Sequence, residues 1–165
     1  PSTVYVEIIR GTPLLAQLFI VYFGLPSLGM NLPPFTSAVI AMGINSGAYV
    51  TEIFRGGIQS IERGQMEAAR SLGLSYLQAM RYIILPQAFK RILPPLGNEF
   101  IAMLKDSSLA STIAIAELMR VGREITSRTF RSFEVLAVVA LMYLAITLPL
   151  SLIVRYTERR MSVSD

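Results

Sequence analysis

A polar, basic stretch of the chain, from Glu67 to Pro86, reads EAARSLGLSYLQAMRYIILP. Apolar segments lie on both sides of it, from Pro34 to about Phe54 and from Ile92 to Leu104. A short charged helix between two apolar segments offers a rigid, water-exposed surface to a protein that is not in the membrane. We therefore expect the apolar segments to form a body that is organised around this stretch.

The distribution of charge indicates the class of protein. Hydrophobic residues make up 53% of the 165 residues and charged residues 16%, whereas soluble domains carry about 25% charge. No charged residue lies between Arg10 and Glu52, or between Glu134 and Arg155, and apolar runs of about 18 or more residues predict transmembrane helices. We therefore expect an all-α integral membrane protein, with one transmembrane domain over residues 1–165.

Several classes of function are disfavoured by what the chain lacks. It has no Cys and no His, which excludes disulfides and thiolate metal sites and removes the commonest general base. Without clustered carboxylates either, nothing in the sequence is equipped for catalysis, so a membrane-embedded enzyme is not expected. The net charge of +4 is modest, and excess Lys and Arg in a membrane protein mostly set its orientation, so nucleic acid is not an expected partner.

Four segments of the chain predict membrane-spanning helices. The first should start at Thr12-Pro13, with Thr12 as the capping residue. The second carries Gly43 and Gly47 in a Gly-x-x-x-Gly pair, which predicts close packing of helices. Because the chain starts at Pro1, without a Met or a signal peptide, we expect at least one further span upstream. The predicted spans are Pro13 (or a start near Val4) to Leu25, Pro34 to Phe54, Ala88 or Ile92 to Leu104, and Val135 to Val154.

Basic residues between these spans predict their orientation. Residues 55–91 hold six basic and two acidic side chains, and such an excess is typical of a cytoplasmic loop. The tail from Arg155 onward is basic as well, so residues 117–134 should face outward, although they carry four Arg. The apolar piece from Leu109 to Ile115 is too short to cross and is expected to be re-entrant or packed.

Two short helices are expected within the central loop. The first runs from Gln65 to Leu72 and ends at Gly73, the residue best suited to a left-handed cap. The second runs from Tyr76 towards Pro86.

The central stretch resembles the EAA loop of bacterial ABC importer permeases. Its spacing of Glu-Ala-Ala, three residues, Gly, nine residues, Ile, one residue and Leu-Pro matches at every position from Glu67 to Pro86. Three flanking stretches are similar to the polar amino acid permeases of the histidine/glutamine/arginine group, namely Glu7 to Leu15, Tyr49 to Ile58 and Leu104 to Leu109. The resemblance covers nearly the whole chain and implies the type I ABC importer permease fold, whose core has about five spans.

The resemblance also implies partners and a location. A multi-pass permease of the bacterial cytoplasmic (inner) membrane pairs with a second permease chain, as a homodimer or a heterodimer, and docks on a dimer of ABC ATPase subunits. An extracytoplasmic amino-acid-binding protein, separate or fused, delivers the substrate. This chain has no Gly-Lys dipeptide and hence no P-loop, so ATP and Mg²⁺ belong to the ATPase partner and no cofactor is expected here. The residues implied in ATPase coupling are Glu67, Ala68, Ala69, Arg70, Gly73 and Pro86.

A substrate pocket is predicted from charges within the third span. Glu99 and Asp106 are seven residues apart, so on a continuous helix they share a face. Charges within a span are costly and usually functional, and two carboxylates would favour basic amino acids such as arginine, histidine or lysine. Side chains that could hydrogen-bond the ammonium or carboxylate ends of the substrate are Asn45, Ser46, Gln17 and Thr12.

Other interpretations of these residues stay open. Glu99 could pair with a basic neighbour such as Lys90 or Arg91, and Asp106 with the lysine before it. Asn45 could join two spans rather than contact a ligand. The alternative function is a secondary amino acid transporter without an ATPase, which would need inverted repeats and interrupted helices; we find no internal duplication. Neither the amino acid nor the pairing of permease chains follows from the sequence.

Overall fold

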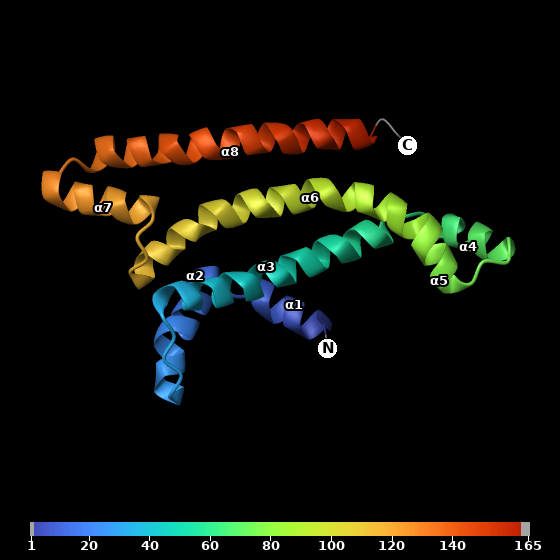
Figure 1. Cartoon of the computed structure of the whole chain (residues 1–165), viewed down its shortest axis with the longest axis horizontal. Helices are drawn as coiled ribbons and strands as arrows, with labels where there is room; N and C mark the ends of the chain where they lie inside the picture. The colour runs from blue at the N-terminus through green and yellow to red at the C-terminus, as the bar shows by residue number, and fades with distance from the viewer. Residues whose placement is uncertain (1, 163–165) are drawn as a thin grey trace.

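The computed structural model describes residues 2–162 (Figure 1). Every regular element within those residues is helical, which confirms the all-α prediction. The elements are α1 (Ser2–Arg10), α2 (Leu14–Phe19), the π-helical η1 (Ile20–Gly24), the 3₁₀-helical η2 (Leu25–Leu28), α3 (Pro34–Gln59), α4 (Arg63–Ser71), α5 (Tyr76–Ala79), the π-helical η3 (Met80–Ile84), α6 (Leu85–Asp106), the 3₁₀-helical η4 (Ser107–Ile113), α7 (Leu118–Thr129) and α8 (Ser132–Ser162).

Three long helices form the body of the molecule. Helix α6 packs against α3 on one side and against α8 on the other, and all three run along the long axis in Figure 1. Helices α4 and α5 lie at one end of this body, next to the C-terminal end of α8, whereas α7 lies at the opposite end. The central stretch and the segment that was predicted to face outward are therefore at opposite ends.

The predicted membrane spans are supported in part. Among residues 2–162, α8 alone is long and apolar enough to cross a membrane, with a mean hydropathy of 2.4 over its most apolar window. Helix α1 and the segment Leu14–Leu28 pass the same test only if taken together as one span bent by 98°. Helix α3, with 26 residues, and α6, with 22, are long enough to cross about 30 Å of hydrocarbon, but both carry polar side chains in their middle.

The break between α1 and α2 differs from the predicted helix start. Pro13 is the residue before α2, and no side chain caps that helix. Thr12 instead donates its hydroxyl to the main-chain oxygen of Ile8, 3.0 Å away in the last turn of α1. The prediction of Thr12 as a cap for the following helix was wrong because the unpaired carbonyls of α1 lie within its reach. A Cβ at Gly11 would lie 2.8 Å from the main-chain oxygen of Glu7, so the sharp turn requires glycine there.

The second predicted helix of the central stretch does not end at Pro86. Helix α5, η3 and α6 follow one another without a break from Tyr76 to Asp106. Pro86 lies in the first turn of α6, and the π-helical turn before it lets the chain pass a residue without an N–H group. Pro94-Pro95, expected where the third span begins, lies well inside α6.

Close helix contacts occur at one glycine of the predicted pair and at other glycines. Nothing lies within 4 Å of a Cβ built on Gly43, and a Cβ on Gly47 would meet only the hydroxyl of Tyr5, at 3.2 Å. Helix α3 approaches α6 instead at Gly57, where a Cβ would overlap the side chain of Ile92. Among residues 2–162, the predicted close packing is therefore present at Gly47, against Tyr5 of α1, and absent at Gly43.

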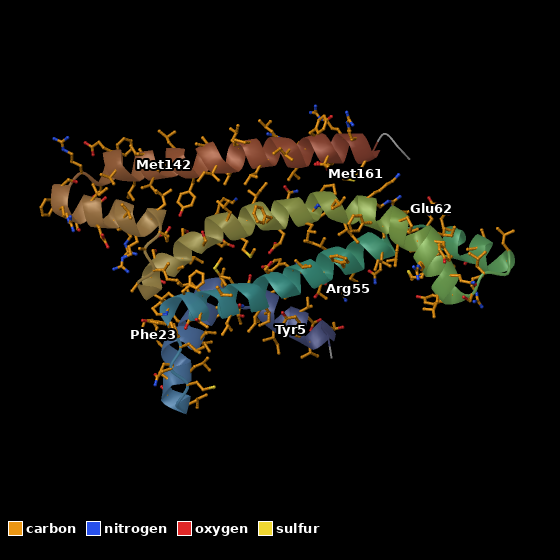
Figure 2. All side chains as sticks on the ribbon, in the orientation of Figure 1. Tyr5, Phe23, Arg55, Glu62, Met142 and Met161 are labelled. Atoms are coloured by element: carbon orange, nitrogen blue, oxygen red, sulfur yellow. The ribbon has the colours of Figure 1, made fainter. Side chains whose placement is uncertain are left out.

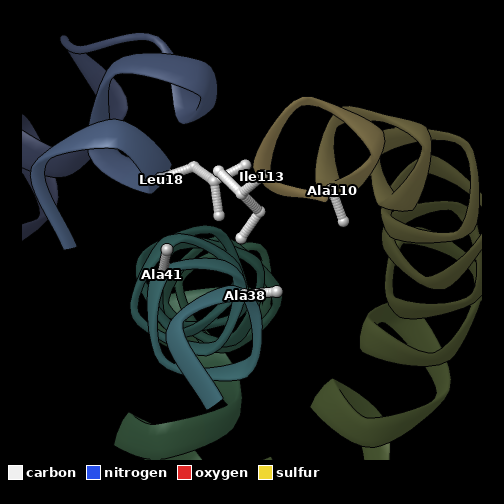
Figure 3. Packing of buried hydrophobic residues seen from close by; sticks show 5 residues of the cluster. All are labelled: Leu18, Ala38, Ala41, Ala110 and Ile113. Atoms are coloured by element: carbon white, nitrogen blue, oxygen red, sulfur yellow. The ribbon is translucent and has the colours of Figure 1, made fainter. Parts of the chain in front are cut away.

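Two small hydrophobic clusters hold the bends of the chain. The first joins α2, α3 and η4 (Figure 3), so the short apolar piece before α7 is packed, as predicted. The second lies where α4 and η3 meet the ends of α3 and α6. The first cluster consists of Leu18, Ala38, Ala41, Ala110 and Ile113, and the second of Ile61, Ile84, Ala88 and Ile92.

Candidate functional site

A cavity of about 650 Å³ lies where the break between α1 and α2 meets the middle of α3 and the C-terminal half of α6. The sharp turn at the break directs its residues towards the two long helices, and η4 closes one side. The lining residues are Arg10, Gly11, Thr12, Pro13, Leu14, Leu15, Asn45, Tyr49, Glu99, Ala102, Asp106 and Leu109.

The structure brings the two predicted carboxylates to one cavity. Glu99 and Asp106 both lie on α6 and both line the cavity, as their spacing predicted. Within residues 2–162 neither carboxylate forms a salt bridge, so no pairing of Glu99 with Lys90 or Arg91 is present. Both carboxylates are available to a ligand.

Asn45 joins two segments of the chain, which was one of the roles considered for it, and it also lines the cavity. Its side chain lines the cavity, is buried, and donates a hydrogen bond of 3.1 Å from Nδ2 to Oε1 of Gln17. Gln17 in turn donates from Nε2 to the main-chain oxygen of Ile9, at 2.7 Å, and to Oγ1 of Thr12, at 2.9 Å. Asn45 therefore joins α3 to the break while it presents part of its side chain to the cavity.

Two of the predicted ligand-binding residues do not reach the cavity. Gln17 is buried behind it, where both polar ends of its amide are engaged by the protein. Ser46 is half-buried on α3 and is absent from the lining. Of the residues predicted for the substrate, the cavity thus holds Thr12, Asn45, Glu99 and Asp106.

Arg10 is a cavity residue that the sequence argument missed. Among the residues that line the cavity, it is the single basic one. Its guanidinium lies over the ring of Tyr49, 5.1 Å from the centroid, and its Nη1 lies 3.9 Å from Oε2 of Glu52. The signal in the sequence was its place as the last charge before a long uncharged run. Its approach to α6 depends on the sharp bend after it, which was not predicted.

The charges of the cavity match those of an amino acid. One guanidinium and two carboxylates line the same space. A guanidinium binds a carboxylate in a two-pronged geometry, and a carboxylate binds an ammonium group. The cavity can therefore hold both ends of an α-amino acid and has one carboxylate left over.

At the other end of the body, the central stretch forms an exposed helix with a defined end. Helix α4 presents Glu67, Ala68 and Arg70 to solvent and buries Ala69. Gly73 follows it with φ of 86°, and its N–H donates to the main-chain oxygen of Arg70 at 3.1 Å. The predicted left-handed cap is confirmed, because only a residue without a side chain adopts this conformation without strain.

The start of α5 is fixed by a capping box that the sequence argument overlooked. The N–H of Gln78 donates to Oγ of Ser75, and the N–H of Ser75 donates to Oε1 of Gln78 at 2.8 Å. The signal was a serine followed three residues later by a glutamine. The box holds the tight turn after Gly73 in place.

Exposed aliphatic side chains lie beside the charged residues of α4. Leu72 is 82% exposed and Leu77 is 77% exposed. Tyr76 and Tyr82 are exposed next to them. A cluster of exposed apolar side chains with a charged rim is typical of a protein-binding surface. The coupling surface is here defined as Glu67, Ala68, Arg70, Leu72 and Leu77.

Comparisons with known proteins agree with this geometry. Residues 1–163 match the family of binding-protein-dependent transport system inner membrane components. The chain is 49% identical over 164 residues to the glutamine transport system permease protein GlnP of Escherichia coli (strain K12), covering 98% of this chain and 75% of that protein. It is 48% identical over 163 residues to the probable glutamine ABC transporter permease protein GlnM of Bacillus subtilis (strain 168), covering 99% and 76%.

A solved structure matches in fold as well as in sequence. It is the crystal structure of an amino acid ABC transporter with histidines, which superposes with a TM-score of 0.91 at 53% identity and covers 96% of this chain and 74% of that one. The chain therefore belongs to the binding-protein-dependent transport system inner membrane components, as a non-catalytic permease subunit of a polar amino acid ABC importer.

Proposed function

We propose that the cavity at the break between α1 and α2 is the substrate site and that it favours basic amino acids. The observation that carries this proposal is the set of charged side chains on one cavity. Arg10 brings one positive charge, and Glu99 and Asp106 bring two negative charges. A volume of about 650 Å³ lies within the range of small-molecule sites. An amino acid would place its α-carboxylate at Arg10 and its ammonium group at one of the carboxylates.

The remaining carboxylate sets the preference for a cationic side chain. A zwitterion such as glutamine leaves one negative charge of the cavity without a partner, and an unpaired charge in a partly buried site is costly. Arginine or lysine would neutralise that charge. Relatives of this chain are named as glutamine, cystine and arginine permeases, so glutamine is the second candidate substrate. Its support is the 49% identity to GlnP.

The coupling surface is proposed to face the cytoplasm and to dock on an ABC ATPase subunit. Its exposed leucines and its charged rim support this role, as does the basic composition of residues 55–91. The unbroken helix from Tyr76 to Asp106 joins this surface to both cavity carboxylates. A displacement of α5 by the ATPase would therefore move Glu99 and Asp106 together, which suits alternating access to the cavity.

The permease is proposed to work as a pair of chains with an extracytoplasmic binding protein, as the family assignment implies. In this orientation α7 faces outward, because it lies at the end of the body opposite to α4 (Figure 1). The assignment favours ATP-driven import over the secondary transporter that the sequence left open.

A panel of amino acids tests the substrate site. ATPase activity of the reconstituted transporter, with its binding protein, is measured with each amino acid in wild type and in Arg10→Met. We expect the largest stimulation by basic amino acids, and we expect Arg10→Met to lose stimulation by every amino acid because all share the α-carboxylate. Arg55→Met is the matched control, since Arg55 pairs with the same Glu52 but lies outside the cavity lining. Equal activity of both variants would argue against the site.

A further inference from the structure

The two long faces of α7 differ sharply in character. On the face towards α8, Gly122 packs against Val139, and Val121 and Ile125 line a groove between the two helices. The opposite face carries basic and hydroxyl groups at helical spacing. We define it as the basic face of α7, which consists of Arg120, Arg123, Glu124 and Ser127, with Arg128 at its edge.

The basic face borders a hollow between α7 and η4. Its volume is about 490 Å³, and its lining residues are Ser111, Thr112, Ala114, Arg120, Arg123, Glu124 and Ser127. Arg120 is engaged there, because its Nε donates to Oε1 of Glu124 at 2.9 Å. Arg123 and Arg128 form no salt bridge among residues 2–162. The hollow therefore combines a free guanidinium with hydroxyl groups, which is the set of donors that binds a carboxylate.

Side-chain orientation agrees with this description. Figure 2 shows nitrogen-tipped side chains on the side of α7 that is turned away from α8. Helix α8 is the helix that qualifies as a span on its own among residues 2–162, so its exposed apolar side chains face lipid. The basic face points away from that lipid-facing helix, towards protein or water.

The turn and loop before α3, which lie at the same end of the body, offer no charge. The turn and loop before α3 expose Leu28, at 74%, and Met30, and residues 11–51 contain no charged side chain. A soluble protein that must arrive and leave in every transport cycle is best steered by charge. Helix α7 supplies three Arg at this end, and Arg131 follows shortly after it.

We propose that the basic face of α7 is the docking surface for the extracytoplasmic binding protein, with an acidic side chain of that protein seated in the hollow beside Arg123. This inference rests on the proposed function, which places α7 on the outer side. It explains why an outward segment carries four Arg against the usual bias of basic residues towards the cytoplasm. The binding protein should accordingly present an acidic surface at its contact with the permease.

The test uses the complete transporter in vesicles of zwitterionic phosphatidylcholine, together with its own binding protein. ATPase activity is measured as the concentration of the substrate-loaded binding protein is raised. In Arg123→Glu/Arg128→Glu we expect the half-maximal concentration to rise about tenfold or more, with unchanged basal ATPase activity. The conservative Arg123→Lys/Arg128→Lys should stay within about threefold of wild type. Arg155→Glu, the same charge change at the opposite end of α8, should have no effect on this concentration.

Salt provides a readout that needs no variant. The half-maximal concentration for wild type should rise as salt is raised, because exposed charges are screened, whereas the doubly reversed variant should respond weakly. An unchanged half-maximal concentration in the variant, or no salt dependence in wild type, would overturn the proposal. An effect that requires anionic lipid in the vesicles would overturn it as well and assign the basic face to a lipid headgroup.

Failure of the orientation can be told apart from failure of the docking surface. The chain has no Cys, so Ser127→Cys supplies a single thiol for a membrane-impermeant reagent applied to intact cells. Labelling from outside supports the orientation on which the inference rests. If the thiol reacts only after the cells are opened, the proposed orientation itself is wrong, and the docking surface falls with it.

Discussion

Asn45 on α3 and Gln17 on α2 form a buried amide pair, with 3.1 Å between Nδ2 of the first and Oε1 of the second. Gln17 also donates to the main-chain oxygen of Ile9 at 2.7 Å. The pair thus ties together three helices at the point where the chain bends by 98°. This bend brings Arg10 to the cavity, so the charge pattern of the site depends on a hydrogen-bond network behind it.

Removing this network should destabilise the permease. Gln17→Leu removes the partner of the buried Asn45 amide, and it leaves the carbonyl of Ile9 with only the 3.3 Å hydrogen bond from the Thr12 hydroxyl. An unsatisfied buried amide costs about 1–3 kcal/mol. Gln87→Leu is the control, because Gln87 makes one hydrogen bond, to the main-chain oxygen of Ile83 within its own helix. Thermal unfolding of the two purified variants should show a clear loss for the first and a small change for the second. An equal melting temperature would contradict the importance of the pair.

Adjacent glycines on α3 should respond in opposite ways to substitution. In Gly57→Ala the new methyl group would overlap Ile92, so α3 and α6 must separate, at a cost of about 1–3 kcal/mol. In Gly56→Ala nothing lies within 4 Å of the new methyl group, and the better helix propensity of alanine should be neutral or stabilising by up to about 1 kcal/mol. Unfolding temperatures of the two variants measure this difference. Similar losses in both would show that the α3–α6 contact does not limit stability.

The exposed leucine Leu77 on the coupling surface should contribute to binding of the ATPase subunit. Leu77→Ser removes an aliphatic side chain that is 77% exposed, so the fold should be unaffected while affinity for the ATPase falls about tenfold or more. Leu28→Ser changes a leucine that is 74% exposed at the other end of the body and serves as the control. Retention of ATPase subunits on the immobilised permease gives the measurement. Loss of retention in both variants would point to a general defect instead of a docking surface.

A crosslink gives an independent check of the same surface. Ala68 is exposed on α4, and Ala68→Cys places the single thiol of the chain at that position. We expect a bifunctional reagent to link it to the ATPase subunit within the assembled transporter. If the reagent links this thiol only to other proteins while the ATPase is present and active, α4 does not lie at the interface with the ATPase.

Features that depend on local sequence were predictable. Gly73 could be recognised as a cap because its left-handed conformation is a property of one residue and its neighbours. Glu99 and Asp106 could be placed on one face because helical spacing is regular. The family, and with it the fold, followed from the complete spacing between Glu67 and Pro86.

Features that depend on distant contacts were not predictable. The role of Gln17 was misjudged, because its partners are a helix end and Asn45, which is 28 residues away. Arg10 was overlooked since only the bend after it brings it to the cavity of Glu99. Pro86 was expected to end a helix, yet a π-helical turn carries the chain past it. In each case contacts with distant parts of the chain, and not the neighbouring sequence, set the partner of the side chain or the course of the helix.

The most direct test of the charge pattern of the cavity is uptake of radiolabelled arginine and glutamine by the reconstituted transporter with Glu99→Gln. With one carboxylate removed, Asp106 still meets the ammonium group of either amino acid, but the side chain of arginine loses its partner. Arginine uptake should fall about tenfold or more, whereas glutamine uptake should change by less than about threefold. Glu7→Gln, an exposed carboxylate on α1 outside the cavity lining, should leave both unchanged. Equal changes in arginine and glutamine uptake, or none, would contradict the account.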